Sequence, residues 1–309
     1  MDRAYLGGVE VTRLILGCGG FGGLGSMPAM FGKGESLEEA FALMDAAWEA
    51  GIRAFDTADA YGGGRSESFI GEWVRSRKRE GLVIQTKTFN PMEEGADFGL
   101  APARVRRQAE TSLARLGIER IDLYLMHAWD PDEPIAETAG VLDELVAEGK
   151  IGAYGLSNVG PDELREGLAA GSFALVQNSY SLLDRDAERD VLPLCAERGI
   201  GFEPFSPLAG GWLTGKYRRG EAPPADSRMT KRPEPYASFR DDAVFDRLER
   251  LEELGDPATL ALGWLLGDPR VTAVVVGPRN PAQLAPALAA IEHPLGEAER
   301  AELSEIFFS

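Results

Sequence analysis

The stretch IDLYLMHAWDPDEPIAETAGVLDELVAEGKIGAYGL, residues 121–156, holds a complete strand–helix–strand unit. It opens with a short apolar run at 121–126 and closes with another at 151–156. The amphipathic segment between them predicts a helix from about Ile135 to Glu148 that stops at Gly149. Apolar runs without alternation are typical of strands buried on both faces, as in a parallel sheet. The stretch therefore predicts two parallel strands joined by a returning helix.

The same succession of short apolar and longer amphipathic segments continues along the whole chain. A capping-box pattern at Ser36 and Glu39, for example, predicts the start of the first helix. Eight strand–helix units within 309 residues predict an α/β fold, a (β/α)8 TIM barrel formed as a single domain over residues 1–309. The predicted strands lie at 14–16, 52–55, 82–86, 121–126, 151–156, 173–177, 200–205 and 271–276. The predicted helices lie at 40–50, 67–76, 103–116, 135–148, 161–170, 188–198, 242–254, 258–266 and 281–291.

Two segments stand outside the eight units. Residues 4–13, with Gly7-Gly8 at their centre, predict an N-terminal β-hairpin that caps one end of the barrel. Residues 210–240 form a long loop at the C-terminal mouth, and its part from 218 to 240 is rich in basic residues. Loops of this length in compact domains are usually functional lids or disordered. Two interpretations stay open for 218–240, a solvated surface loop and a lid that closes over an anionic cofactor.

Composition excludes several classes of protein. With 32 Lys and Arg against 50 Asp and Glu, the net charge is −18, which argues against a nucleic acid or an anionic membrane as partner. No apolar run reaches the roughly 20 residues of a membrane span, and Met1 to Tyr5 do not open a signal peptide, so we expect a cytoplasmic protein. Two cysteines and two histidines without ligand spacing predict no metal site. The oligomeric state cannot be read from the sequence.

Polar residues follow the predicted strands at the points where the strands end. Asp56 and Tyr61 follow the second strand, Lys87 ends the third and His127 follows the fourth. In a parallel barrel the carboxyl ends of all strands meet at one mouth, so residues far apart in the sequence are expected to converge there. Further polar residues lie at the ends of the later strands: Ser157, Asn158, Gln177, Ser206, Arg279 and Asn280.

At these positions the chain resembles the aldo-keto reductases. The resemblance covers essentially the whole chain, and implies a nicotinamide cofactor, commonly NADPH, held without a Rossmann domain. Carried over residue by residue, it implies a catalytic tetrad of Asp56, Tyr61, Lys87 and His127. The matching segments are FDTADAYG at 55–62, IQTK at 84–87, RIDLYLMH at 120–127, GKIGAYGLSN at 149–158, LVQNSYS at 175–181, FEPFSPLAGGWLTGKY at 202–217 and VVVGPRNPAQL at 274–284.

The tetrad has a physical rationale for carbonyl reduction. A carbonyl that accepts hydride becomes an alkoxide and needs a proton, yet tyrosine has a pKa of about 10. The ammonium of Lys87 would stabilise the tyrosinate and lower the pKa of Tyr61, and Asp56 would hold that lysine in place. His127 would donate a hydrogen bond to the carbonyl oxygen and orient it. Tyr61 is therefore predicted to be the general acid.

The resemblance also implies a cofactor site. Ser157, Asn158 and Gln177 resemble the residues that hold the nicotinamide carboxamide, and Phe205 matches the ring that stacks on the nicotinamide, where many relatives have tyrosine. Arg279 and Gln283 fall in the segment around the adenosine, where Arg279 would bind the 2′-phosphate of NADPH. The chain departs from the family at Ala285-Pro286-Ala287, where relatives often carry an acidic residue and an asparagine against the adenine. Further predicted cofactor residues are Ser206, Pro207, Leu208, Gly210 and Lys216, in or beside the pyrophosphate clamp, and Gly277.

One motif points elsewhere. Residues 17–22, GCGGFG, satisfy the GxGxxG pattern of a Rossmann fold, but such a fingerprint requires a helix to open at once. No helical period appears before about residue 37, so a loop after the first strand is the better interpretation. Phe21 in this loop, together with Trp129 and Trp212 beside the motif residues, is a candidate for the substrate pocket.

The leading function is therefore an NADP-dependent reductase that converts an aldehyde or ketone, a small-molecule carbonyl such as a sugar or natural product, into an alcohol. The alternative is a non-catalytic, nicotinamide-binding, redox-sensing subunit, a role that some barrels of this family have. The complete tetrad disfavours it. A metal-dependent hydrolase would require ligands that the chain lacks. The physiological substrate cannot be identified from the sequence.

Overall fold

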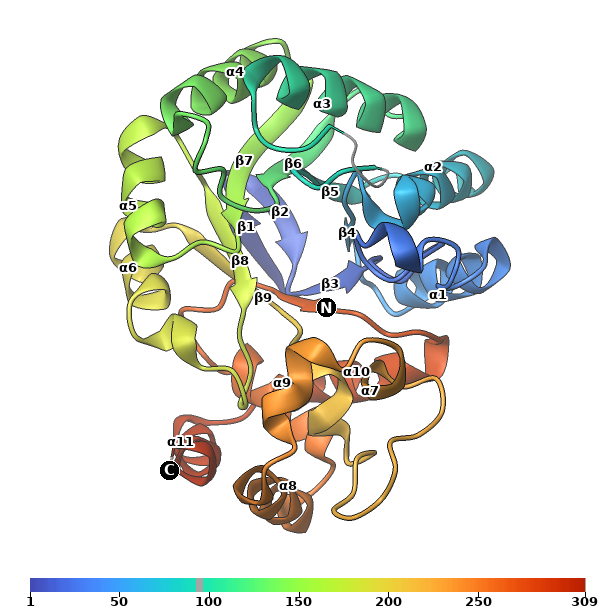
Figure 1. Ribbon diagram of the computed structural model, residues 1–309, viewed down its shortest axis with the longest axis vertical. Coiled ribbons are helices and arrows are strands. Elements are labelled where there is room, and N and C mark those ends of the chain that lie inside the picture. Colours follow the sequence, from blue (N-terminus) through green and yellow to red (C-terminus); the bar gives the residue numbers. More distant parts are fainter. Residues whose placement is uncertain (93–96, 309) are drawn as a thin grey trace.

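Eight parallel strands form a nearly closed barrel in the computed structural model, which describes residues 1–92 and 97–308 (Figure 1). They follow one another in the order β10-β3-β4-β5-β6-β7-β8-β9. Between β9 and the segment before β10, Thr272 N donates to Phe202 O at 2.9 Å, which brings the two edges of the sheet together. The strands are β3 (Leu14–Gly17), β4 (Ala54–Asp56), β5 (Val83–Thr88), β6 (Ile121–Met126), β7 (Ile151–Ser157), β8 (Leu175–Ser179), β9 (Gly201–Phe205) and β10 (Val274–Val276).

Helices surround the sheet, and several of their ends lie at the residues that the sequence indicates. Ser36 and Glu39 form the expected capping box at the start of the first helix, and Gly117, with φ of 67°, ends the third. None of the described helices is long and apolar enough to cross a membrane. The helices are α1 (Leu37–Glu49), α2 (Arg65–Arg77), α3 (Pro102–Leu116), α4 (Ile135–Ala147), α5 (Pro161–Ala170), α6 (Val191–Arg198), α7 (Arg228–Lys231), α8 (Asp242–Leu254), α9 (Pro257–Leu266), α10 (Ala285–Glu292) and α11 (Glu297–Phe307).

The hydrophobic core has two parts. Inside the barrel a small cluster includes Ile15, Leu123 and Val275, while a larger cluster between strands and helices includes Phe55 and Tyr124. Neighbouring residues of one strand, such as Leu123 and Tyr124, therefore point to different apolar layers. Burial on both faces explains why the strands are continuous apolar runs in the sequence.

The predicted N-terminal hairpin is present, with β1 (Arg3–Leu6) paired antiparallel to β2 (Val9–Thr12). Leu6 and Val11 are buried among the residues of the inner cluster, and Figure 1 shows the hairpin across the centre of the ring of strands. Gly7 has a φ of 56°, and a Cβ there would lie 2.6 Å from the Cβ atoms of Ala153 and Ala174. A glycine is therefore required where the hairpin turns against the barrel wall.

The sequence misplaced some element ends and missed two helices, the short α7 in the loop after β9 and α11 near the C-terminus. The last strand was expected from residue 271, but Val271 and Thr272 accept hydrogen bonds from the side chain of Arg13, and pairing with β3 begins at Val274. The helix α11 was not predicted, although Leu303, Ile306 and Phe307 have the i, i+3, i+4 spacing of a buried face.

The long loop after β9 is partly helical, with 3-10 turns at Ala209–Thr214 and Glu234–Phe239 and the short helix α7 between them. Its basic character is partly neutralised by α8, since Arg218 pairs with Glu252 and Arg219 is bridged by acidic residues of the same helix. The excess of basic residues that suggested a lid is thus partly a packing feature of this loop.

Candidate active site

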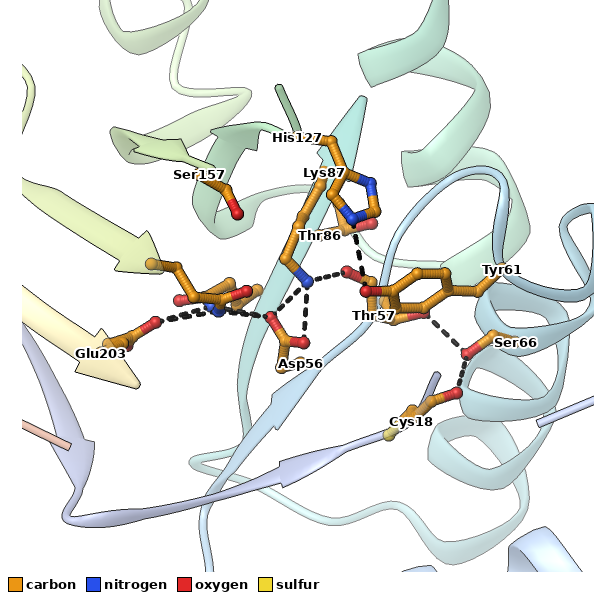
Figure 2. Close-up of polar contacts among 12 residues, drawn as sticks. Cys18, Asp56, Thr57, Tyr61, Ser66, Thr86, Lys87, His127, Ser157 and Glu203 are labelled. Atoms are coloured by element: carbon orange, nitrogen blue, oxygen red, sulfur yellow. Dashed lines mark hydrogen bonds and ion pairs between the residues drawn. The ribbon is translucent and has the colours of Figure 1, made fainter. Parts of the chain in front are cut away.

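The four predicted catalytic side chains converge at the carboxyl ends of three neighbouring strands (Figure 2). Asp56 is the last residue of β4, Lys87 lies near the end of β5, and His127 directly follows β6. Tyr61 lies in a 3-10 turn, Tyr61–Gly63, between β4 and α2. The fold therefore brings together residues that are separated by up to 71 positions in the sequence, as expected for residues at the carboxyl ends of the strands of a parallel barrel.

Lys87 and Asp56 form a buried ion pair at the base of the site. The Nζ atom lies 2.6 Å from Asp56 Oδ1 and donates to Asp56 Oδ2 at 2.7 Å and to Thr57 O at 2.8 Å. Lys87 is fully buried and Asp56 is 3% exposed. Burial acts to lower the pKa of Lys87, but Asp56, together with Tyr61 and Glu203, outweighs it, so the pKa is raised and the lysine is charged.

Tyr61 and His127 lie above this pair and are only partly buried, so a small molecule can reach them from the mouth. The Tyr61 hydroxyl lies 3.4 Å from His127 Nε2, and Lys87 Nζ lies 5.1 Å from the centre of the tyrosine ring. Burial raises the pKa of Tyr61, although Lys87 acts in the opposite direction. The ammonium of Lys87 acts in the expected direction, but burial outweighs it, so the pKa of Tyr61 is raised overall.

His127 has a further contact that the sequence did not reveal. Asn90 Nδ2, from the segment after β5, lies 3.1 Å from His127 Nδ1, and Asn158 Nδ2 donates to the carbonyl of His127 at 2.8 Å. Burial, followed by the positive charge of Lys87, holds the pKa of His127 well below its usual value. The imidazole is therefore neutral at physiological pH.

The glycine-rich loop after β3 packs against the turn that carries Tyr61. A Cβ on Gly23 would lie 2.6 Å from Cα of Gly62, and Gly62 itself has a φ of 60°. Only a residue without a side chain permits this approach of the two backbones. Gly22, the last glycine of the GxGxxG pattern, has a φ of 66°, and a Cβ there would lie 2.5 Å from the Cβ atom of Arg65, so this glycine is required by packing. No α-helix opens before Leu37, which confirms the loop interpretation.

A second buried network lies deeper in the barrel and was missed by the sequence reasoning. Gln85 Nε2 donates to Asp56 Oδ1 at 2.7 Å and to Glu203 Oε2 at 2.9 Å, and Gln177 Nε2 makes the same two bonds at 3.0 and 3.1 Å. Glu203 is fully buried, and burial raises its pKa to about 7. A charged residue inside a strand that is otherwise apolar was the signal in the sequence.

This network fixes the orientation of one predicted cofactor residue. Both hydrogen bonds of Gln177 use its amide nitrogen, so the amide oxygen is turned away from the carboxylates. An amide oxygen is an acceptor, and the N–H groups of a nicotinamide carboxamide are donors. At the neighbouring strand end, Asn158 donates to Ser157 Oγ at 3.0 Å and has a φ of 57°. The chemistry of these three side chains fits a carboxamide.

The predicted phosphate-binding loop after β9 has an unusual backbone. Ser206, Gly210 and the intervening Ala209 all have positive φ, at 52°, 65° and 48°. Phe205 ends β9 beside the inner core cluster, and Pro207 is buried. Left-handed conformations at non-glycine residues cost energy and cluster at functional sites. This loop therefore fits the role that the sequence predicts for Ser206, Pro207, Leu208 and Gly210.

Cations gather where the loop after β9 faces the loop after β10. The pKa of Lys216 is lowered by burial and then by the positive charges of Arg228 and Arg279, which shows that the three cations are close. Lys216 forms no ion pair with a described carboxylate. Such a cluster of cations fits an anionic ligand, and a dinucleotide with its phosphates is one.

Arg279 is already engaged by protein groups. Its Nε atom pairs with Glu35 Oε1 at 3.1 Å, and its Nη1 donates to Asp226 O at 2.8 Å. Its backbone N donates to the side chain of Gln283, which therefore shares the segment after β10 that also contains the exposed Gly277. Burial raises the pKa of Glu35, and the arginine acts in the opposite direction. Glu35 is a residue of this site that the sequence analysis did not find.

The three predicted substrate-pocket residues, Phe21, Trp129 and Trp212, all belong to or pack against the main core cluster. Phe21 is buried in the main core, and Trp129, just after His127, is partly buried against it. Trp212 is buried against Tyr217 and lines a separate cavity of about 370 Å³ under the loop after β9. A substrate role for these residues stays a prediction. Among the described residues, no group of three or more His, Cys, Asp or Glu side chains is placed to hold a metal ion.

The chain is similar over nearly its whole length to known oxidoreductases. It is 35% identical to the uncharacterized oxidoreductase YrpG of Bacillus subtilis, covering 99% of this chain and 96% of that protein. It is 33% identical to the NADH-specific methylglyoxal reductase of Escherichia coli, covering 99% of this chain and 98% of that enzyme.

Two solved structures share the fold. The holo form of aldo-keto reductase AKR11C1 from Bacillus halodurans superposes with a TM-score of 0.81 at 28% identity, covering 99% of this chain and 96% of that one. The glycerol dehydrogenase AKR11B4 from Gluconobacter oxydans gives a TM-score of 0.85 at 26% identity, covering 99% and 94%. The model of the aldo/keto reductase family matches residues 13–307, and the chain belongs to that family.

Proposed function

We propose that the protein is an NADP-dependent oxidoreductase that reduces an aldehyde or a ketone to an alcohol, with Tyr61 as the general acid. The observation that carries the proposal is the buried Lys87–Asp56 pair beneath two partly exposed groups, Tyr61 and His127. This arrangement offers one proton donor and one neutral hydrogen-bond donor to the same small molecule. It fits a reaction in which negative charge develops on an oxygen atom.

The proposed role of each catalytic residue follows from the geometry of the site. A bound nicotinamide dinucleotide supplies the hydride that the carbonyl carbon accepts. Tyr61 gives the proton of its Oη atom to the carbonyl oxygen, and the charge left on Tyr61 lies beside the ammonium of Lys87. Asp56 keeps Lys87 charged and in position. His127 is neutral, so it can donate a hydrogen bond without competing for the proton.

The preference for NADPH is also a proposal. It is supported by Arg279 and by the neighbouring cations Lys216 and Arg228, because a 2′-phosphate adds negative charge that a guanidinium can bind through two hydrogen bonds. The relative from E. coli is named as NADH-specific, so membership of the family does not by itself decide the cofactor. The ion pair of Arg279 with Glu35 engages the Nε edge of the guanidinium, so it limits the hydrogen bonds that Arg279 can offer to a 2′-phosphate.

The proposal also includes a cytoplasmic location and a single domain. Cys18 and Cys195 are buried and unpaired, as suits the reducing environment of the cytoplasm. One core cluster includes residues from Leu14 near the start of the chain to Phe307 near its end, which supports a single domain over residues 1–309.

The proposal is tested by following the absorbance of NADPH while the purified protein is mixed with 4-nitrobenzaldehyde, an activated aldehyde. A panel of ketones, sugars and a dicarbonyl such as methylglyoxal then defines the substrate, with alcohols used to test the reverse direction. We expect turnover with at least one carbonyl. Tight binding of NADPH without turnover of any compound would instead support the redox-sensing subunit.

A further inference from the structure

The two ring nitrogens of His127 face different partners. Nε2 lies 3.4 Å from the Tyr61 hydroxyl, on the side of the mouth. Nδ1 lies 3.1 Å from the side-chain amide nitrogen of Asn90, on the opposite edge of the ring. A neutral imidazole carries one N–H and one acceptor nitrogen, and the bond made by one nitrogen decides the state of the other.

The partner of Nδ1 determines where the proton lies. An amide nitrogen can only donate, so a ring nitrogen facing it must accept. The low pKa of His127 leaves the ring with a single proton at physiological pH. That proton is then on Nε2, the atom that faces Tyr61.

We propose that Asn90 is a positioning residue that holds His127 as the Nε2–H tautomer, so that His127 donates a hydrogen bond toward Tyr61 and the substrate oxygen. The inference rests on the proposed function for its catalytic meaning, but the tautomer is a property of the protein itself. In the opposite tautomer, Nε2 would accept the hydroxyl proton of Tyr61. The general acid would then donate to the histidine and not to the substrate.

Asn90 is itself firmly placed. The backbone carbonyl oxygen of Asn90 accepts from Arg104 Nη2 at 3.0 Å, and Arg104 is 3% exposed. The same guanidinium donates to Thr88 Oγ1 at 2.9 Å and to Gly99 O at 2.8 Å, which ties the end of β5 to the start of α3. On the histidine side, His127 N donates to Thr88 O at 2.9 Å. Both partners of the Asn90–His127 bond are therefore anchored to the end of one strand.

The tautomer can be measured directly. The chain has two histidines, and His293 is exposed, so it serves as an internal reference in a spectrum of protein labelled with ¹⁵N-histidine. We expect the two ¹⁵N shifts of His127 at pH 7 to show Nε2–H and an unprotonated Nδ1. An Nδ1–H signal in the wild type would mean that Asn90 presents its oxygen to the ring, and would overturn the proposal. This result does not depend on whether a carbonyl is reduced.

Two substitutions distinguish a role of Asn90 in setting the tautomer of His127 from a role in packing alone. In Asn90→Asp the carboxylate can only accept, so it draws the proton to Nδ1, and we expect kcat for carbonyl reduction to fall about 10²-fold or more, as for the loss of one oriented donor. Asn90→Ala, which removes the bond without reversing it, is expected to lose about tenfold. In both variants the KM for NADPH should stay near the wild-type value.

The direction in which the activity of Asn90→Asp changes with pH tests the proposed tautomer. A carboxylate beside the ring raises the pKa of His127, and a protonated ring carries N–H at both nitrogens. The other titratable groups that face His127 among the described residues, Lys87 and Tyr61, keep their state in this range. Activity of the variant should therefore recover as the pH falls through the histidine range, while that of Asn90→Ala should not. Unchanged kcat in Asn90→Asp, or no recovery at low pH, would refute the assignment.

Discussion

Glu35 and Arg279, 244 residues apart in the sequence, form an ion pair between the loop after β3 and the loop after β10. Glu35 is 5% exposed and has its carboxylate on the Nε edge of the guanidinium. The Nη1 atom of the same arginine bonds Asp226 O, in the loop after β9. One guanidinium thus joins three loops at the mouth of the barrel. The carboxylate of Glu35 thus occupies one edge of the Arg279 guanidinium, to which the 2′-phosphate of NADPH would bind.

Neutralising Glu35 is therefore expected to increase the preference for NADPH. In Glu35→Gln the arginine no longer has a competing carboxylate, and one charge-assisted hydrogen bond of about 1.5–3 kcal/mol becomes available to the phosphate. The ratio of kcat/KM for NADPH over NADH should rise about tenfold or more. The control is Glu38→Gln, because Glu38 is an exposed acidic residue nearby in the sequence and forms no ion pair with a described residue. An equal rise of this ratio in both variants would mean that the preference for NADPH depends on the net charge near the site and not on the Glu35–Arg279 ion pair.

The converse substitution, Arg279→Ala, should remove most of the preference for NADPH and spare activity with NADH. Loss of the charge-assisted bonds predicts a fall of the same ratio by about ten- to a hundredfold. Steady-state kinetics with both cofactors measure it. A ratio that does not change would show that another residue reads the 2′-phosphate, and a wild type that prefers NADH would refute the proposed cofactor.

Tyr61→Phe tests the general acid. The substitution keeps the ring above Lys87 and removes the proton that the substrate oxygen needs. We expect a loss of about 10²–10⁴-fold in turnover, with cofactor binding retained. Binding of NADPH is followed separately by fluorescence titration. Near-normal turnover with intact binding would remove Tyr61 from the mechanism.

The loop at 218–240 should become less accessible when the cofactor binds, if it acts as a lid. Arg228 lies near Lys216 and Arg279, whereas Arg218 and Arg219 are already held by α8. We therefore expect NADPH to slow tryptic cleavage after Arg228 and Lys231 more than cleavage after Arg218. Mass spectrometry of the fragments over time gives the rates. The same rates with and without cofactor would make the segment a surface loop.

Glu203 should make the stability of the protein depend on pH. Its pKa of about 7 in the folded state exceeds the usual value near 4.5, so between these values the folded state binds more protons than the unfolded state. The free energy of unfolding therefore falls as the pH rises through this window. Glu203→Gln removes the effect, and its stability relative to the wild type should improve by on the order of 3 kcal/mol between pH 4.5 and pH 8.

Unfolding in urea at these two pH values measures the change. Asp59, whose pKa burial also raises to about 7, is present in both proteins and cancels in the comparison. A difference between the two proteins that stays constant with pH would mean that Glu203 does not hold a proton in the folded state.

The sequence predicted the parts of the molecule that obey a local rule. Asp56, Lys87 and His127 lie at strand ends, and strand ends in a parallel barrel share one mouth. Asn90, Glu203 and Glu35 were missed because their roles depend on a partner elsewhere in the chain: a ring nitrogen, two amide groups and a guanidinium. The opposing effect of burial on the pKa of Tyr61 could not be predicted for a similar reason, since burial is a property of the packed structure.

The hairpin at the N-terminus has a kinetic consequence. Leu6 and Val11 are buried in the inner core cluster, so the hairpin closes the barrel on the side away from the mouth, and Lys87 and Asp56 are buried between the two. In the proposed reaction, the hydrogen that Tyr61 gives to the substrate must be replaced through the same opening by which the alcohol leaves. Tyr61 is then reprotonated only after the product has left. While a product occupies the mouth, replacement of this hydrogen from deuterated solvent would therefore follow the rate of product release.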